Sequence, residues 1–310
     1  MAVAVIRFLV GRLIASVAIV FAVATASFVL LRAAPGGPFD TEQRRSAVVQ
    51  RAMEDRYGLH QPLWRQYGRA MAQLARGDLG ASMKRDVSVA GLIAEHGPIS
   101  ALLGALGLSA ALALGVALGA LAAWRRNTWL DAVVMTAALI GISIPAFVLG
   151  PLLIAALALR LGWLPAARVD GAASLILPAI TLGLVYVGTI ARLTRGGLID
   201  VLDQDFVRTA RAKGLPEHRV IARHALRAGI TPVVTYLGPA TAAMISGSFV
   251  VERIFQIPGL GTYFLTSVLE RDYPVVTGVF VFYAVLLVML NLAVDLAYGA
   301  LDPRLRERAR

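Results

Sequence analysis

The residues best placed to do chemistry lie in a basic stretch, 205–232, that separates two strongly apolar runs. It reads D-F-V-R-T-A-R-A-K-G-L-P-E-H-R-V-I-A-R-H-A-L-R-A-G-I-T-P. Two sets of residues recur there with four-residue spacing: Asp205, Thr209 and Lys213, and Phe206 and Ala210. Each set shares one face of a predicted helix, and the acidic start and basic end suit the helix dipole. The chemistry indicated is recognition, in which a short surface helix docks in the groove of another protein.

The end of this predicted helix is marked by a glycine and a proline. Gly214 predicts a left-handed stop, and Pro216 predicts a new helix that starts at this proline, with Glu217 directly behind it. The second helix is expected to run into the membrane. A solvated connection with no docking role has the same pattern, so both interpretations stay open on the pattern alone.

Catalytic, nucleotide-binding and metal-binding patterns are absent from the sequence. There is no G-x-x-x-x-G-K-[ST] loop for ATP, and neither H-E-x-x-H nor G-x-S-x-G occurs. The chain has no cysteine, which excludes disulfides and zinc–thiolate sites. Its four histidines are scattered without ligand spacing: His60, His96, His218 and His224. We therefore predict no catalytic, cofactor-binding or metal-binding residue and no enzyme activity in this chain.

The composition is that of an integral membrane protein. Of 310 residues, 58% are hydrophobic and only 16% are charged, with a mean hydropathy of +0.71. A soluble domain would carry roughly a quarter charged residues, so an all-α membrane fold is expected. The net charge of +11 would suggest nucleic acid in a soluble protein. Here the basic residues follow the loops, so we expect a lipid surface and no nucleic acid.

Six apolar runs predict six membrane spans, at 13–31, 97–124, 132–159, 171–191, 228–251 and 274–294. The second and third have 28 residues each, which predicts tilt or overhang. Pro145 and Pro151 predict a kinked third span, and Pro178 a kinked fourth span. A cleaved signal peptide is the rival interpretation of the first run. That run is longer than a usual signal core and five more follow it, which favours an uncleaved span.

Charge placement predicts the topology. Outside the long segment after the first run, the proposed cytosolic parts hold 16 Lys and Arg, and the short outer loops hold four. This bias predicts cytosolic termini and a cytosolic 192–227 loop. The polar segment 35–96 then lies outside, with a helical stripe at 63–74 and a turn at 77–80.

The 205–226 stretch resembles the cytoplasmic loop by which permeases of bacterial ABC importers dock on their ATPase subunits. It is closest to the peptide-permease branch, D-[YF]-[VI]-R-T-A-R-A-K-G-L-x-x-x-x-[VI]-x-x-R-H-A-L. The general importer signature has Glu-Ala-Ala where this chain has Arg208, Thr209 and Ala210, and its glycine is matched by Gly214. Its later Ile and Pro fall on His224 and Arg227, which depart from the general signature.

Other motifs extend the resemblance along nearly the whole chain. They are R-x-A-P-G at 32–36, S-I-P-x-F at 143–147, I-F-x-x-P-G-L-G at 254–261, R-D-Y-P-V-V at 271–276 and D-P-R at 302–304. Together they identify a permease of the oligopeptide/dipeptide importer type. The runs A-P-G-G-P-F at 34–39 and Y-L-G-P-A at 236–240 resemble the oligopeptide branch more closely.

This resemblance implies a six-helix type I importer permease in the bacterial inner membrane, with both termini cytoplasmic. The implied parts are the first span (1–34), an extracytoplasmic insertion (35–96), a five-helix core (97–298) and a cytoplasmic tail (299–310). The insertion either contacts a binding protein or caps the channel mouth. The implied partners are a second, homologous permease, two ATPase subunits that bind ATP and Mg, and an extracytoplasmic substrate-binding protein.

The resemblance also implies the docking residues: Asp205, Phe206, Arg208, Thr209, Ala210, Arg211, Lys213, Gly214, Leu215 and Pro216. Phe206 and Ala210 are expected to enter the ATPase groove. Polar contacts at its rim are expected from Arg208, Arg211 and Lys213, and the residue expected to set the break between the helices is Gly214.

Other functions stay open on the sequence. A permease for dipeptides, nickel or another small solute would have a similar sequence, and a stand-alone secondary transporter or channel would need no ATPase. No charged residue lies in the middle of a predicted span, which argues against proton coupling. Asn291 and Asp295 come nearest to such a site, and an internal cap or polar contact near the inner membrane face is the favoured interpretation of them.

Overall fold

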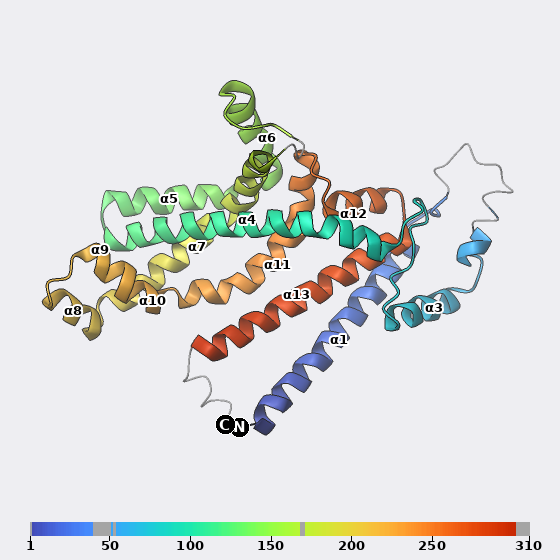
Figure 1. The fold of residues 1–310 in the computed structure, drawn as a ribbon, viewed down its shortest axis with the longest axis horizontal. Helices are drawn as coiled ribbons and strands as arrows, with labels where there is room; N and C mark the ends of the chain where they lie inside the picture. The colour runs from blue at the N-terminus through green and yellow to red at the C-terminus, as the bar shows by residue number, and fades with distance from the viewer. Residues whose placement is uncertain (1, 40–50, 52–53, 168–170, 302–310) are drawn as a thin grey trace. The chain divides into compact units, whose positions relative to one another are not determined.

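The computed structural model describes residues 2–39, 51, 54–167 and 171–301, and these are almost entirely helical (Figure 1). Within these ranges the only β-type pairing is an isolated bridge between Ala81 and Ser88. The α-helices are α1 (Ala2–Ala33), α3 (Leu63–Ala75), α4 (Val89–Trp124), α5 (Trp129–Ser143), α6 (Ala146–Leu153), α7 (Ile176–Leu202), α8 (Asp205–Ala212), α9 (Glu217–Arg219), α10 (Leu226–Gly229), α11 (Thr231–Ile254), α12 (Leu260–Leu269) and α13 (Tyr273–Leu301). Shorter segments are the π-helices η1 (Ile154–Arg160) and η3 (Val220–Ala225) and the 3-10 helix η2 (Ala172–Leu175).

Among the described residues, four helical segments are long and apolar enough to cross a membrane: Val10–Ala33, Val89–Trp124, Ala172–Leu202 and Tyr273–Ala293. Two bent pairs also qualify: Trp129–Ser143 with Ala146–Arg160, and Glu217–Gly229 with Thr231–Ile245. The count is six if each bent pair forms one span, which is the number that the apolar runs predict. The chain is therefore an all-α membrane protein.

The third predicted span is broken rather than kinked, which corrects the expectation from sequence. Its two halves, α5 and α6–η1, are bent by 104°. Ile144 between them has φ −90° and ψ 115°, outside the helical region. The following Pro145 explains this, because a proline ring disfavours helical geometry in the residue before it. The chain ends one helix here and starts another.

The kink predicted at Pro178 in the fourth span is also corrected. Pro178 is the third residue of α7, directly after the 3-10 segment η2. The first backbone N–H groups of a helix have no partner within the helix, so a proline costs little there. Pro178 therefore lies in the first turn of α7 and interrupts no helix.

One compact unit comprises residues 99–258 and the described residues after 288, and α7 lies at its centre. Helices α5, α6, α10 and α11 all pack against α7. Its core contains large buried side chains from several helices: Leu103, Leu177, Ile190, Met244, Val251 and Phe255. A second cluster at the end of α7 holds Leu198, Val201 and Leu202 with residues of α8 and η3. The second cluster seats the predicted docking segment.

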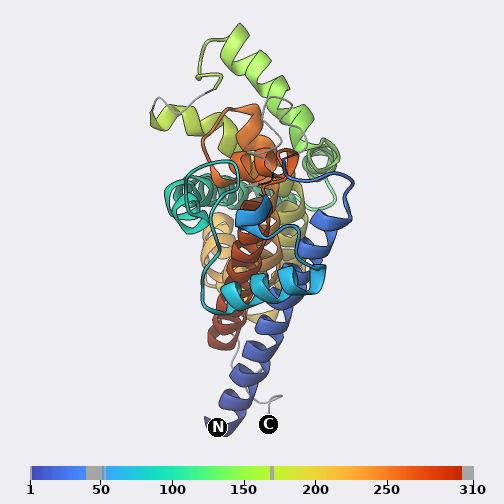
Figure 2. The same cartoon turned by 90° about the vertical axis from the view of Figure 1, so that its right-hand side faces the viewer.

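The other compact unit comprises the described residues up to Pro98 with residues 259–288. Helix α3 crosses α1 (Figure 2). The hydroxyl groups of Thr25 on α1 and Tyr67 on α3 lie 2.9 Å apart. A hydroxyl contact of 3.2 Å between Ser27 and Thr277 joins α1 to α13. Helix α3 forms where the stripe at 63–74 predicts a helix.

Candidate functional site

The docking segment folds as a short helix, α8, that ends in a glycine turn. Gly214 has φ +75°, which confirms the predicted left-handed stop. The Gly214 N–H donates to the Arg211 carbonyl at 2.9 Å, and the Leu215 N–H donates to the Ala210 carbonyl at 3.4 Å. These two bonds form a Schellman motif, which needs a residue that tolerates positive φ. The turn therefore depends on glycine.

The second helix starts one residue later than predicted. Pro216 has φ −65° and ψ 145° and flanks α9, which begins at Glu217. The helical path continues through η3 and α10, and residues 217–229 are bent by 59° from 231–245. Pro216 is thus the cap of α9 and not its first residue. The apolar helix α11 follows directly after this bend.

The inner face of α8 packs against its own chain. Val207 is fully buried and Ala210 is 5% exposed, in the cluster with Leu198 and Val220. A helix turns by about 100° per residue, so Ala210 lies about 40° from Phe206 and about 60° from Val207. Ala210 therefore belongs to the buried side, and the expectation that its side chain enters a partner's groove is wrong for this structure.

The outer face of α8 presents one aromatic residue among charged neighbours. Phe206 is 43% exposed, and Arg208, Thr209 and Lys213 are exposed as well. Arg208 lies 3.5 Å from Asp205, and both side chains are largely exposed, so this pair adds little stability. The surface available to a partner is therefore Phe206 with Thr209 and Lys213 on one side of the helix, and Arg208 about 160° away on the other side.

Arg211 braces the segment while its side chain stays 39% exposed. Its Nη2 lies 2.7 Å and its Nε 3.2 Å from the Glu217 carboxylate, across the Gly214 turn. Its Nη1 donates to the Leu202 carbonyl at the end of α7, at 3.2 Å. The hydrogen bond to Glu217 raises the pKa of the Arg211 guanidinium. The guanidinium thus makes contacts within the chain and is still open to solvent, and the expected contact at a partner's rim stays a prediction.

Two further ion pairs fix the base of the segment. Arg126 and Asp203 form a two-pronged pair at 2.9 and 3.3 Å, which joins the 125–128 turn to the end of α7. This hydrogen bond lowers the pKa of the exposed Asp203 carboxyl. Arg195 donates to both oxygens of the buried Asp131 at 2.7 Å each, which joins α7 to α5. Paired guanidinium–carboxylate bonds fix relative orientation as well as distance.

Sequence reasoning missed the Asp131–Arg195 pair. It counted Arg195 only among the basic residues of the cytosolic loop. The available signal was Asp131, an acidic residue directly before the uncharged run 132–159. Such a residue needs a partner when it is buried.

The backbones of α7 and α10 come into direct contact at two glycines. A side chain at Gly197 of α7 would collide with the Gly229 carbonyl of α10, and one at Gly229 would lie 2.9 Å from the Gly197 carbonyl oxygen. Small residues at helix crossings in membranes permit this approach. Neither glycine can therefore carry a side chain unless α7 and α10 shift apart.

The R-D-Y-P-V-V motif forms a second ordered feature, in the other unit. Asp272 is fully buried and accepts hydrogen bonds from the Ser82 hydroxyl and from the Met83 N–H, the latter at 3.0 Å. Arg85 pairs with Glu270 at 2.9 Å. The motif therefore holds the 81–88 segment to the α12–α13 corner, a role that the sequence alone did not reveal.

Some predicted features cannot be compared with the structure. The D-P-R motif at 302–304 and Arg168 lie outside the described residues, and only the helical backbone of Asp295 is described. Within the described part of the chain, no group of three or more His, Cys, Asp and Glu is arranged to hold a metal ion.

Comparison with known proteins identifies the family. Residues 115–307 match the binding-protein-dependent transport system inner membrane component family. The chain is 42% identical over 304 residues to the oligopeptide transport system permease protein OppB of Escherichia coli K12, and 40% identical over 304 residues to that of Haemophilus influenzae. Each alignment covers 97% of this chain and 99% of the relative. The dipeptide transport system permease protein DppB of Bacillus subtilis is 42% identical over 301 residues, covering 97% of this chain and 98% of the relative. The resemblance seen in the motifs is confirmed, and the chain belongs to the family of inner membrane components of binding-protein-dependent transport systems.

Proposed function

We propose that this chain is a permease subunit of an ATP-driven importer and forms, with a second and homologous permease, the path for oligopeptides delivered by a binding protein. The observation that carries the proposal is the geometry of α8. One exposed aromatic residue, Phe206, shares its side of a helix braced to α7 with Thr209 and Lys213, while Arg208 lies on the opposite side. A rigid helix with an exposed apolar residue suits docking in a partner's groove.

The braces explain how work done by a partner would reach the membrane helices. When two ATPase subunits close on ATP and Mg, the docked α8 moves with them. Arg211 pulls on the end of α7, and the Gly197–Gly229 contact passes the movement between α7 and α10. Rigid elements joined in this way move as bodies, which suits alternating access of a central path. This chain contributes no ATP-binding group of its own to the cycle.

The proposed topology follows from charge and from the family. The 192–227 loop and both termini face the cytoplasm, where most basic loop residues gather. The docking residues proposed for this loop lie within 205–216, with Phe206, Arg208 and Lys213 as direct contacts. The 35–96 segment faces outward, where a binding protein would deliver the substrate.

The substrate class follows from the relatives. Two are named for oligopeptide transport and one for dipeptide transport, at nearly equal identity. The motifs at 34–39 and 236–240 favour oligopeptides. A permease for dipeptides or for another small solute is the alternative that a transport assay distinguishes.

The test is purification through a tag on this chain from its native membrane. We expect a second six-span protein and P-loop ATPases to co-purify. ATP hydrolysis should rise when the binding protein and peptides of two to six residues or so are added, a length range chosen to separate the two peptide classes. A stable complex with transport activity but without any ATPase would overturn the proposal in favour of a self-sufficient transporter or channel.

A further inference from the structure

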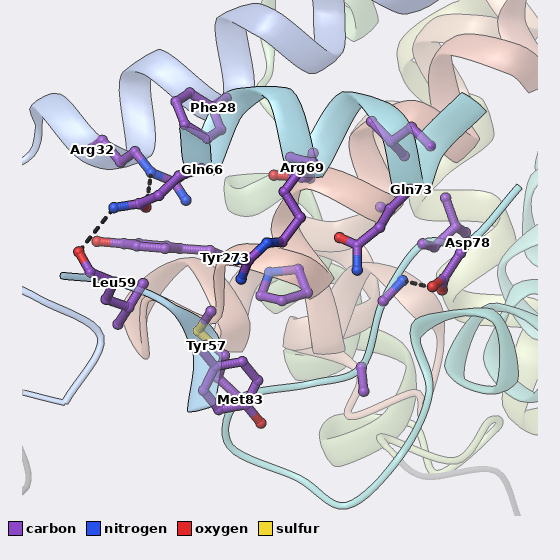
Figure 3. Close-up of a pocket in the computed structure, with 18 of the residues that line it drawn as sticks. Phe28, Arg32, Tyr57, Leu59, Gln66, Arg69, Gln73, Asp78, Met83 and Tyr273 are labelled. Atoms are coloured by element: carbon purple, nitrogen blue, oxygen red, sulfur yellow. Dashed lines mark hydrogen bonds between the residues drawn. The ribbon is translucent and has the colours of Figure 1, made fainter. Parts of the chain in front are cut away.

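A lined cavity lies in the unit that contains α1, α3 and α13 (Figure 3). Its volume is about 220 Å³. A neighbouring cavity of about 300 Å³ shares four of its lining residues: Arg32, Leu59, Gln66 and Tyr273. Small-molecule sites usually have volumes of roughly 300–1,000 Å³. The first cavity lies below this range and is therefore of a size for one end of a short peptide. The docking segment takes no part in either cavity.

The lining of the first cavity carries an excess of positive charge. Arg32, Arg56 and Arg69 all line it, with Asp78 as the one carboxylate among its lining residues. An oxygen of Asp78 already accepts the Gly80 N–H at 2.8 Å. Among the described residues, no ion pair within 4.0 Å joins any of the three arginines to a carboxylate. Three guanidinium groups therefore share the described lining with one carboxylate, which pairs with none of them.

Arg32 is held in place by uncharged groups. Its guanidinium carbon lies 3.6 Å from the Phe28 ring centroid and 5.0 Å from that of Tyr273. Its Nε donates to the Gln66 Oε1 at 3.0 Å, and the Gln66 amide in turn donates to the Leu59 carbonyl at 2.9 Å. Aromatic faces and one amide orient the half-buried cation but leave its charge unneutralised.

Arg69 reaches the same space from α3. In Figure 3 its side chain extends from α3 beside Tyr273 into the cavity. One guanidinium nitrogen donates to the side-chain oxygen of Gln61 at 2.8 Å. Opposite the cations, Leu59 and Met83 provide apolar wall. The lining therefore combines a cationic end, amide hydrogen-bonding groups and apolar surface. Guanidinium groups match carboxylates in geometry, with two parallel N–H donors for two oxygens.

We propose that this cavity binds the terminal carboxylate of a short peptide, with Arg32 and Arg69 as the pairing cations. The inference rests on the proposed function, because it takes peptides as the transported class. A peptide's carboxylate supplies further negative charge beside the three guanidinium groups, its amides meet Gln73, and its side chains lie along the apolar wall. The permease thereby holds one end of its substrate at a site separate from the binding protein.

The experiment uses the complete importer in nanodiscs of zwitterionic lipid, without the binding protein. Trialanine with a free carboxylate and trialanine C-terminal amide are the two probes, and their affinities are measured by calorimetry. Arg69→Gln should weaken binding of the free acid by about tenfold, the effect of losing one charged hydrogen bond. The control is Arg65→Gln on the same helix, because Arg65 is exposed and does not line the cavity. It should leave the affinity unchanged.

Three results would overturn the inference. The acid and the amide could bind equally, Arg69→Gln could match Arg65→Gln, or phosphatidylglycerol in the nanodisc could occupy the site while trialanine does not. Binding-protein-stimulated ATP hydrolysis is measured in the same preparation. If hydrolysis is stimulated while these probes fail, the carboxylate site is wrong and the importer function stands. If no ATPase is present, the proposed function itself fails.

Discussion

Two adjacent glycines of α7 give the sharpest test of how the docking segment is supported. A Cβ added at Gly197 would lie 3.1 Å from the Gly229 carbonyl carbon and 3.3 Å from Pro232 Cδ, and it would be closer still to the Gly229 oxygen. A Cβ added at Gly196 would meet nothing within 4 Å. Alanine at the two positions therefore makes the same chemical change with opposite steric outcomes.

The expected magnitudes follow from these distances. Carbon atoms pack best at about 3.5–4.0 Å, so Gly197→Ala must separate α7 from α10 by at least about 0.5 Å. Forced repacking of this kind costs about 1–3 kcal/mol. Gly196→Ala in an open helical position should instead stabilise the protein by about 0.5–1 kcal/mol, because alanine favours helix. The predicted difference in unfolding free energy between the variants is about 1.5–4 kcal/mol, the span covered by these two effects.

The assay compares thermal unfolding of the purified chain in detergent, followed by ATP-driven uptake in reconstituted importer. Gly197→Ala should lower the unfolding temperature and reduce uptake per ATP hydrolysed, because the support behind α8 is displaced. Gly196→Ala should match or exceed the unmodified protein in both. Equal unfolding temperatures and equal uptake for the two variants would refute the close contact between α7 and α10 and the coupling path built on it.

Four further outcomes are expected. Gly214→Val should impair the coupling of ATP hydrolysis to uptake while membrane insertion stays normal, because positive φ costs a branched residue about 1–2 kcal/mol or more. Gly214→Asn should have a milder effect. Uptake by the valine variant equal to that of the unmodified importer would contradict this. Phe206→Ala should leave the unfolding temperature unchanged and weaken ATPase co-purification, and retained ATPase at high salt would argue against its role. Asp272→Ala should expose the 81–88 segment to proteolysis and destabilise the chain by about 1–3 kcal/mol, because the Ser82 and Met83 donors lose their acceptor. Asp272→Asn should retain part of the protection. Equal cleavage of both variants and the unmodified chain would exclude a role of Asp272 in holding this segment. The ion pair that lowers the pKa of Asp203 stabilises the fold above the unfolded pKa of about 3.9, and this stabilisation is lost as the pH falls through the lower folded pKa. Asp203→Asn should therefore flatten the loss of thermal stability as the pH falls below about 4, with Arg126→Gln as the matching partner variant.

Local features of the docking segment were predictable from sequence because their causes are local. The charge order of 205–213 and the glycine at 214 specify a short helix and a left-handed turn, and both are present. The stripe at 63–74 specifies α3 for the same reason. Hydrophobic run lengths likewise predict the number of candidate spans, since bilayer thickness sets the length of a crossing helix.

The pairings were not predictable, because they join residues far apart in the chain. Asp131 meets Arg195, and Asp272 meets Ser82, only after the helices have packed. The 104° break at Ile144 also exceeds what a proline pattern alone specifies, since the same proline is compatible with a modest kink. For the two pairs, the sequence gives no information about which distant residue each aspartate meets. For the break, it gives no information about the size of the bend.

The face of α8 that meets a partner shows why a motif can mislead about roles. Phe206 and Ala210 share a spacing that is typical of one docking face, yet a turn of about 40° separates an exposed side chain from a buried one. Which side is buried is decided by Val207 and its cluster, not by the helix itself. Arg211 likewise has the composition of a contact residue and acts as a brace. Much of the motif therefore specifies how α8 is held, and the proposed recognition surface narrows to Phe206 and the exposed cations Arg208 and Lys213.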